Sequence, residues 1–75
     1  MPALPRVAGR DCIAALHKAG YRLARQRGSH VRLHHPTRTP VTVPLHKTLD
    51  RGTLRAILRT TDIPVEAFIE LMAER

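Results

Sequence analysis

Aromatic residues, cysteine and acidic residues are all scarce in this 75-residue sequence. It contains one Tyr (Tyr21), one Phe (Phe68), one Cys (Cys12) and no Trp. The core must therefore be built from aliphatic side chains, and the bases of a single-stranded nucleic acid would find almost no rings to stack on. A lone cysteine excludes an internal disulfide and every multi-cysteine zinc pattern. Because Cys12 lies among apolar residues, we expect a buried, inert thiol rather than a nucleophile.

Long apolar runs are also missing. No stretch approaches the roughly 20 residues of a membrane-spanning helix, and the N-terminus has no apolar core of the signal-peptide type. We therefore expect a soluble, cytoplasmic protein that has no membrane partner. Residues 1–75 suffice for one small domain and no second one. A hydrophobic content of 43% is typical of a folded chain rather than a disordered one.

Acids are rare outside the last segment of the chain. Thirteen Lys and Arg oppose six Asp and Glu, which gives a formal net charge of +7. Residues 1–61 hold 12 of the cations and two of the acids, a balance of +10, whereas residues 62–75 hold one cation and four acids, a balance of −3. A body this basic indicates a polyanionic partner, most often a nucleic acid. The alternative is that the charge only keeps a small protein soluble.

Three segments are predicted to be helices. Apolar residues recur at helical spacing over residues 9–19 and 50–60. Pro64 is placed to open a third, short helix, because proline is favoured at the first helical position. The apolar residues of the three helices are Cys12, Ile13, Leu16 and Ala19, then Leu54, Ile57 and Leu58, and finally Val65, Phe68, Ile69 and Met72.

Alternating residues predict three short strands, over residues 21–27, about 29–35 and 41–45. Pro44 cannot donate a ladder hydrogen bond, so the third strand lies at an edge or ends there. Alternation gives each strand one covered side and one solvent side. The covered side would include Leu23, Val31, Leu33, Val41, Val43 and Leu45, and the solvent side Arg22, Ala24, Gln26, His30, Arg32, Thr42 and, past the third strand, His46.

The predicted order is α-β-β-β-α with a short additional helix at the C-terminus. Such a chain forms an α+β domain in which helices cover one face of a three-stranded antiparallel sheet. The double-stranded-RNA-binding domain has this order of elements. The order of elements does not by itself establish a function.

The turn between the first two predicted strands carries the chemistry. Gly28 allows backbone angles that other residues resist, and Ser29 is a small turn residue. We expect both to shape the turn rather than to react. His30 follows, with Arg32 on the same side of the strand. An imidazole can take or give a proton near neutral pH, and fixed positive charge beside it suits chemistry on a phosphodiester. The alternative for His30 is a solvated strand histidine.

Four blocks of the chain resemble the HicA family of bacterial mRNA-interferase toxins. They are residues 16–21 (LHKAGY), 26–30 (QRGSH), 41–47 (VTVPLHK) and 52–58 (GTLRAIL), within a similarity that covers roughly residues 9–72. The resemblance implies a fold like the double-stranded-RNA-binding domain, cleavage of mRNA that inhibits translation, and a catalytic histidine in the Gly-Ser-His motif, which is His30 here. It further implies neutralisation by a HicB-type antitoxin that covers the basic active face. It implies no metal or other cofactor.

Metal-independent RNA cleavage needs a base, an acid and cations around the developing charge. We expect His30 to be the general base or acid. His46 is either a second proton-transfer group or a loop anchor. The candidates for binding RNA phosphates are Arg22, Arg27, Arg32 and Lys47. A metal site is disfavoured, because His30 and His34 would lie about 13 Å apart along a strand and no acid is near them in sequence.

Two other functions remain open. The chain could be a non-catalytic RNA-binding module, which would leave no cleavage for a His30 substitution to remove. A DNA-binding protein is less well supported, because no recognition-helix pair is evident. The acids of the last segment form a stripe that is either simply solvated or docks on the basic body of a second copy. The two assemblies considered are a homodimer and a heterotetramer with the antitoxin. These acids are Asp62, Glu66, Glu70 and Glu74.

Overall fold

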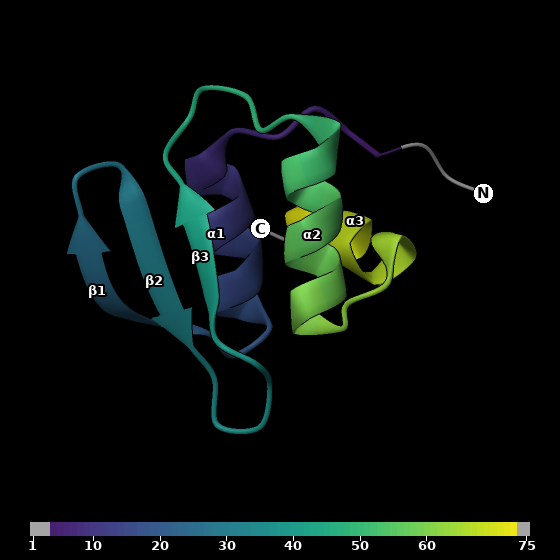
Figure 1. Ribbon diagram of the computed structural model, residues 1–75. Coiled ribbons are helices and arrows are strands. Elements are labelled where there is room, and N and C mark those ends of the chain that lie inside the picture. The colour runs from purple at the N-terminus through teal and green to yellow at the C-terminus, as the bar shows by residue number, and fades with distance from the viewer. Residues whose placement is uncertain (1–3, 74–75) are drawn as a thin grey trace.

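The computed structural model describes residues 4–73. In chain order its elements are α1 (Gly9–Lys18), β1 (Arg22–Arg27), β2 (His30–His34), β3 (Val41–Pro44), α2 (Arg51–Thr61) and α3 (Val65–Ala73) (Figure 1). The strands form one antiparallel sheet in the order β1-β2-β3. The predicted α+β fold is confirmed, and each predicted boundary lies within one residue of the observed one.

The core lies between the inner side of the sheet and the helices. In Figure 1, α1 lies behind the sheet and α2 stands beyond β3, and α3 packs against α1. Both aromatic side chains, Tyr21 and Phe68, are completely buried. The other large core side chains are Val7, Leu16, Val31, Leu33, Val41, Val43, Leu49, Leu54, Ile57, Leu58 and Ile63. The outer side of the sheet bears exposed polar residues, including His30, His34 and Thr42.

A β-bulge in β1 changes which of its residues face outward. Leu23 pairs with Leu33 and Arg25 pairs with Arg32, so Ala24 is the extra residue between them. Strict alternation would place Arg25 on the covered side together with Leu23. The extra residue reverses the alternation, and Arg25 lies opposite Arg32 on the outer side.

The remainder of β1 follows the reversed alternation. Arg27 pairs with His30, and Gln26 pairs with Val31, a buried residue of the inner side. The prediction that Gln26 faces outward beside His30 is therefore wrong, because its pairing places Gln26 on the inner side. Gln26 nevertheless remains exposed, since β1 is an edge strand. The bulge thus brings Arg25 and Arg27 to the same side as His30.

Two leucines predicted to face the core are exposed instead. Leu23 is 64% exposed, since β1 is the strand farthest from β3, where α1 makes its main contacts with the sheet. Leu45 is 39% exposed, because β3 ends at Pro44 and the chain then turns toward the start of α1. The backbone N–H of Gly9 donates to the carbonyl oxygen of His46 across 2.9 Å and holds that turn in place.

His35 ties the loop after β2 to the end of α1. Its Nε2 lies 2.9 Å from the carbonyl oxygen of Ala19, and its Nδ1 accepts from the backbone N–H groups of Thr37 and Arg38, each at 3.1 Å. These contacts require the tautomer that carries its proton on Nε2. The ring also packs against Tyr21, with centroids 4.8 Å apart. The role of this histidine is structural.

Asp50 caps the N-terminus of α2. Its Oδ1 accepts from the backbone N–H of Thr53 at 2.7 Å. Hydrogen bonds from the Thr53 side chain and backbone, with a smaller contribution from nearby His46, hold the pKa of the Asp50 carboxyl below its usual range. A lowered folded-state pKa means that the ionised cap stabilises the fold above the unfolded-state pKa of about 3.9, and that this contribution is lost as the pH falls through the lower folded-state pKa.

We therefore expect Asp50→Ala to lower the melting temperature at pH 7, because the orphan N–H of Thr53 loses its acceptor. The difference from the native protein should shrink as the pH is lowered below about 4. Asp50→Asn is the control, since asparagine caps equally well without titrating. Thermal unfolding followed by circular dichroism measures both. A difference that persists unchanged in acid would contradict the assignment.

The acidic residues of the last segment are exposed. Asp62 follows α2 in the left-handed conformation, and Glu66 and Glu70 lie on the exposed side of α3. Glu74, predicted to continue this stripe, lies outside the described residues. Among residues 4–73 no helix is both long enough and apolar enough to span a membrane.

Candidate functional site

The turn between β1 and β2 is held from both sides. Gly28 has a φ of +58°, a conformation that a side chain would disfavour. The amide of Gln26 donates to the carbonyl oxygen of Gly28 across 3.2 Å, and the N–H of Leu45 donates to that of Ser29 across 2.6 Å. Gly28 and Ser29 therefore lie where the sequence predicts them, in a turn that places His30 at the first position of β2.

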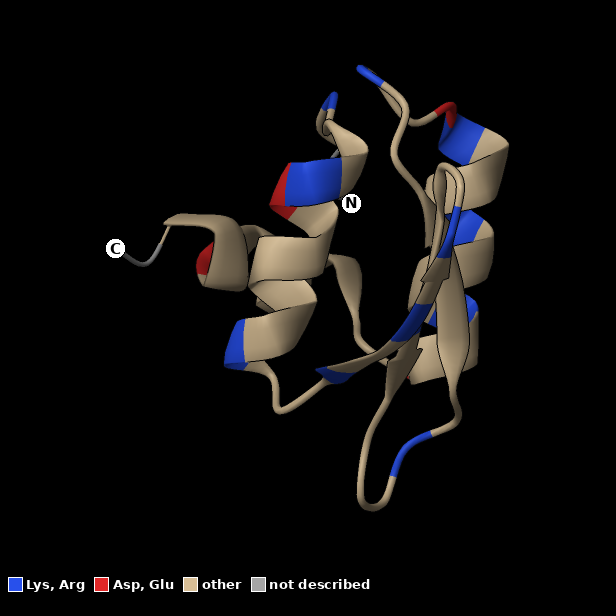
Figure 2. Ribbon diagram, turned by 90° about the vertical axis from the view of Figure 1, so that its left-hand side faces the viewer, with Lys and Arg blue, Asp and Glu red and all other residues tan. Residues whose placement is uncertain are grey.

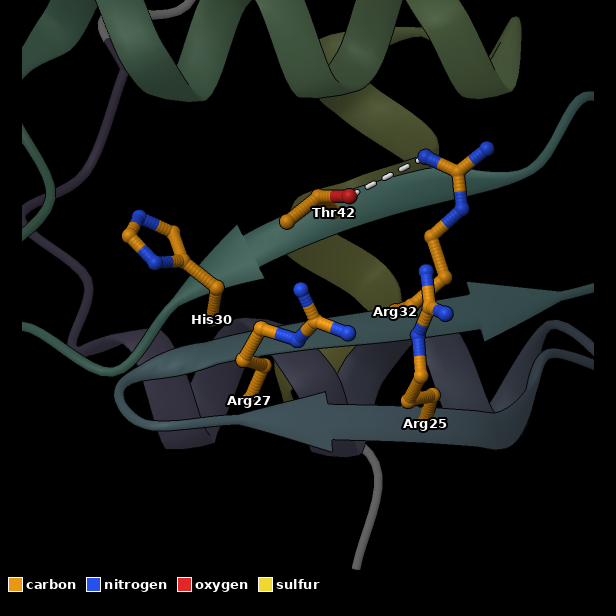
Figure 3. Close-up of a pocket in the computed structure, with 5 residues that line it drawn as sticks. All are labelled: Arg25, Arg27, His30, Arg32 and Thr42. Atoms are coloured by element: carbon orange, nitrogen blue, oxygen red, sulfur yellow. Dashed lines mark hydrogen bonds between the residues drawn. The ribbon is translucent and has the colours of Figure 1, made fainter.

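A shallow hollow of about 280 Å³ opens on the outer side of the sheet. Its lining comes from all three strands: Arg25 and Arg27 of β1, His30 and Arg32 of β2, and Thr42 of β3 (Figure 3). We call it the basic hollow. Arg32 is held in place by a hydrogen bond of 3.0 Å from its Nη1 to the hydroxyl of Thr42.

The basic hollow has a strong positive field. Arg25, Arg27 and Arg32 always carry charge, and none of the described residues that line the hollow is acidic. Figure 3 shows the three guanidinium groups arranged along the sheet, whereas the ring of His30 points away from them, past the tip of β3. Figure 2 shows basic residues distributed over the strand nearest the viewer, the helices and the lower loop. A guanidinium row beside an imidazole suits a phosphodiester that lies across the sheet.

The structure brings together only some of the residues predicted to bind phosphate. Arg27 and Arg32 line the basic hollow with His30. Arg22 is engaged at the end of α1 instead, where its Nη1 donates to the carbonyl oxygens of Tyr21, at 2.9 Å, and His17, at 3.3 Å.

Lys47 and His46 line a different hollow, around the end of β3. His46, predicted as a second proton-transfer group or a loop anchor, thus lines this hollow and not the basic hollow. The carbonyl oxygen of His46 accepts a hydrogen bond from the N–H of Gly9. The charge of the His46 side chain contributes to the lowered pKa of Asp50. Among residues 4–73, His30 is thus the only histidine that lines the basic hollow.

Arg25 is the site residue that reasoning from the sequence missed. Alternation placed it on the covered side of β1, where an unpaired charge would be costly to bury. That conflict is itself a signal of a bulge, because strict alternation from Leu23 would have directed both Arg25 and Arg27 toward the core. The exact position of the extra residue, Ala24, depends on the pairing with β2.

Other chemistries find little support in the described part of the chain. No group of three or more His, Cys, Asp or Glu side chains within residues 4–73 is arranged to hold a metal ion. Cys12 is completely buried, and burial raises the pKa of its thiol to about 12. A thiol with such a pKa stays protonated at neutral pH and is a poor nucleophile.

A protein-family model matches most of the chain. The family model described as the HicA toxin of bacterial toxin–antitoxin matches residues 9–63. The matched segment is more than half of the chain, runs from the start of α1 past the end of α2, and includes every residue of the basic hollow. No curated protein matches the chain.

Proposed function

Because the chain belongs to the HicA family of toxins of bacterial toxin–antitoxin systems, we propose that it is an endoribonuclease that cleaves mRNA and thereby inhibits translation. The observation that carries the proposal is the basic hollow, in which His30 lies with three arginines on the uncovered side of the sheet. We further propose that His30 is the general acid or base, as the family resemblance of its Gly-Ser-His motif implies.

In the proposed reaction the ribose 2′-hydroxyl loses its proton and its oxygen attacks the adjacent phosphorus. The bond to the 5′-oxygen breaks, and that oxygen takes up a proton as it leaves. The products are a 2′,3′-cyclic phosphate and a free 5′-hydroxyl. His30 transfers one of the two protons, and Arg25, Arg27 and Arg32 stabilise the extra negative charge on the phosphorane oxygens. This scheme uses no metal ion.

The toxin family also implies a cognate antitoxin. We propose a HicB-type protein that covers the basic hollow, since an acidic surface would complement the three guanidinium groups and deny RNA access to His30. We place the reaction in the cytoplasm, where mRNA is found, and regard the toxin as part of a stress response. Assembly of the pair into a heterotetramer, or of the toxin alone into a homodimer, is part of the same proposal.

The test is incubation of the purified protein with end-labelled mRNA in EDTA. Cleavage to products that end in a 2′,3′-cyclic phosphate is the expected result. If the protein retards the RNA on a native gel but leaves it intact, the chain is a non-catalytic RNA-binding module and the proposed reaction is wrong. If cleavage requires an added divalent metal, the metal-independent scheme is wrong.

The arginine that the bulge brings into the site gives a separate prediction. Arg25→Ala should raise the Kd for single-stranded RNA several-fold and reduce the slope of log Kd against log salt by about 0.7, the value for one phosphate contact. Arg59→Ala is the matched control, because Arg59 is exposed in the last turn of α2, outside the hollow. Fluorescence anisotropy over a salt series measures both slopes. Equal salt slopes for the two variants would show that Arg25 does not contact an RNA phosphate.

A further inference from the structure

A second hollow lies at the end of β3, whose last residue, Pro44, is the cross-strand partner of His30. It measures about 640 Å³ and is lined by Ala8 and Arg10 at the start of α1 and by Leu45, His46 and Lys47 after β3. We call it the flanking hollow. We propose that it binds a nucleotide next to the scissile phosphate, with its base against Leu45 and its phosphate between Arg10 and Lys47. This inference rests on the proposed function, because it assumes that RNA is bound at His30.

The position of the flanking hollow follows from the pairing of the strands. Pro44 is the cross-strand partner of His30, and Leu45 is the next residue, with its N–H bonded to the carbonyl oxygen of Ser29. Cross-strand neighbours have Cα atoms about 5 Å apart. Figure 3 shows the ring of His30 directed away from the three guanidinium groups and past the tip of β3, the strand that ends at Pro44. An RNA strand that crosses the three arginines of the basic hollow and passes His30 would therefore reach Leu45 next.

Backbone hydrogen bonds hold the walls of the flanking hollow together. The N–H of Gly9 donates to the carbonyl oxygen of His46 at 2.9 Å, and the N–H of Leu49 donates to that of Val7 at 2.7 Å. The backbones of Gly9 and Pro44 approach so closely that no Cβ fits at Gly9. The start of α1 and the segment after β3 are thus fastened together, so a ligand does not have to order the walls of the site.

The chemistry of the lining fits a nucleotide. Arg10 and Lys47 are exposed cations, and within residues 4–73 no acidic residue lines the hollow. The carboxylate closest in sequence on the β3 side, Asp50, is engaged by Thr53. The volume lies within the range of about 300–1,000 Å³ that is typical of small-ligand sites. Exposed cations beside the apolar side chains of Ala8 and Leu45 match the two parts of a nucleotide, a phosphate and the flat face of a base.

Leu45 is one of two large apolar side chains that are exposed in residues 4–73, the other being Leu23. Both aromatic rings of the chain are buried and cannot stack on a base. An aliphatic side chain covers a base by apolar contact, without discriminating strongly between bases. Of the two leucines, only Leu45 lies directly after the partner of His30, whereas Leu23 is on the inner side of the edge strand β1.

The test uses fluorescein-labelled single-stranded RNA in which every 2′-hydroxyl is methylated. Such RNA lacks the attacking group, so anisotropy reports binding whether or not the protein is a ribonuclease. We expect Arg10→Ala combined with Lys47→Ala to raise Kd roughly tenfold at low salt and to lower the salt slope by about 0.7, the value for the one phosphate that the two cations hold. Leu45→Ser should raise Kd for this RNA but not for an abasic backbone of equal length.

Matched controls isolate the site. Arg59→Ala removes one cation outside both hollows, so it is compared with each of the single variants Arg10→Ala and Lys47→Ala. Leu23→Ser removes the other exposed leucine and is compared with Leu45→Ser. Circular dichroism checks that each variant is folded.

The outcomes are distinct. If the variants of the flanking hollow weaken RNA binding no more than their controls do, the inference is overturned. The same conclusion follows if they weaken binding of the cognate antitoxin but not of RNA, since the hollow is then a protein interface. If they weaken RNA binding as expected while unmodified mRNA is never cleaved by the native protein, the nucleotide site stands and the proposed ribonuclease function fails.

Discussion

His30→Ala is expected to lower the rate of RNA cleavage by about 10²–10⁴-fold, the usual contribution of general acid–base catalysis, while the Kd for RNA changes little. The side chain is exposed at the first position of β2, so its removal leaves no cavity in the core. The three arginines of the basic hollow, which we propose to bind the RNA phosphates, remain in this variant. Loss of rate without loss of affinity is the signature of a group that acts in the transition state.

Single-turnover cleavage of labelled mRNA in EDTA and anisotropy with 2′-methylated RNA measure the two quantities separately. His34→Ala is the matched control, because His34 is also an exposed β2 histidine but does not line the basic hollow. We expect this variant to retain most of the native rate. If the two variants cleave equally well, another residue performs the proton transfer or the activity is a contaminant. If His30→Ala loses affinity in parallel with rate, His30 binds RNA rather than transferring a proton.

Gly9→Ala is expected to destabilise the fold by about 2–3 kcal/mol, the cost of forcing an extra atom into a well-packed site. A Cβ at this buried position would overlap the carbonyl oxygen of Pro44 and lie 3.0 Å from the Cα of Leu45. Both obstacles are backbone atoms, which cannot rotate away as a flexible side chain would. The N–H of residue 9 can still donate to His46, so the substitution isolates the effect of the added atom.

The same substitution at Gly52 provides the control. Gly52 is exposed in the first turn of α2, and within the described residues a Cβ there would meet Asp50 Oδ1 alone, at an ordinary contact distance of 3.9 Å. Gly52→Ala should stabilise the protein by about 0.5–1 kcal/mol, the difference in helix propensity. Thermal unfolding would then show melting temperatures that move in opposite directions, downward by roughly 10–20 °C for Gly9→Ala and upward by a few degrees for Gly52→Ala. Shifts of the same sign would contradict the close approach of α1 and β3.

Local patterns in the sequence were sufficient to predict the elements and most of the core. Helical spacing identified Leu16, Leu54, Leu58 and Phe68, all of which are buried. These patterns are reliable because a helix or a strand imposes its own period on the side chains that must be covered. The turn of Gly28 and Ser29 could be placed on the same grounds, since its backbone requirement is local.

The composition of the candidate site was decided by the tertiary structure. Arg25 enters the basic hollow only because a bulge at Ala24 reverses the alternation of β1, and the pairing with β2 determines where that bulge falls. Arg22 is diverted to the carbonyl oxygens at the end of α1. The pairing of β1 with β2 and the contact of Arg22 with His17 join residues of different elements, and no local period encodes them.

The sequence by itself determined the order of the elements, the apolar sides of the helices, the strongly basic character of the chain and the histidine at the tight turn. Only the packing of α1 against β3 decided that Arg10 would line one hollow together with Leu45 and Lys47. The physical reason is the distance along the chain over which each kind of interaction acts. Periodicity and turn chemistry act over a few residues, whereas the grouping of cations on one surface depends on strand register and on backbones that approach from distant parts of the chain.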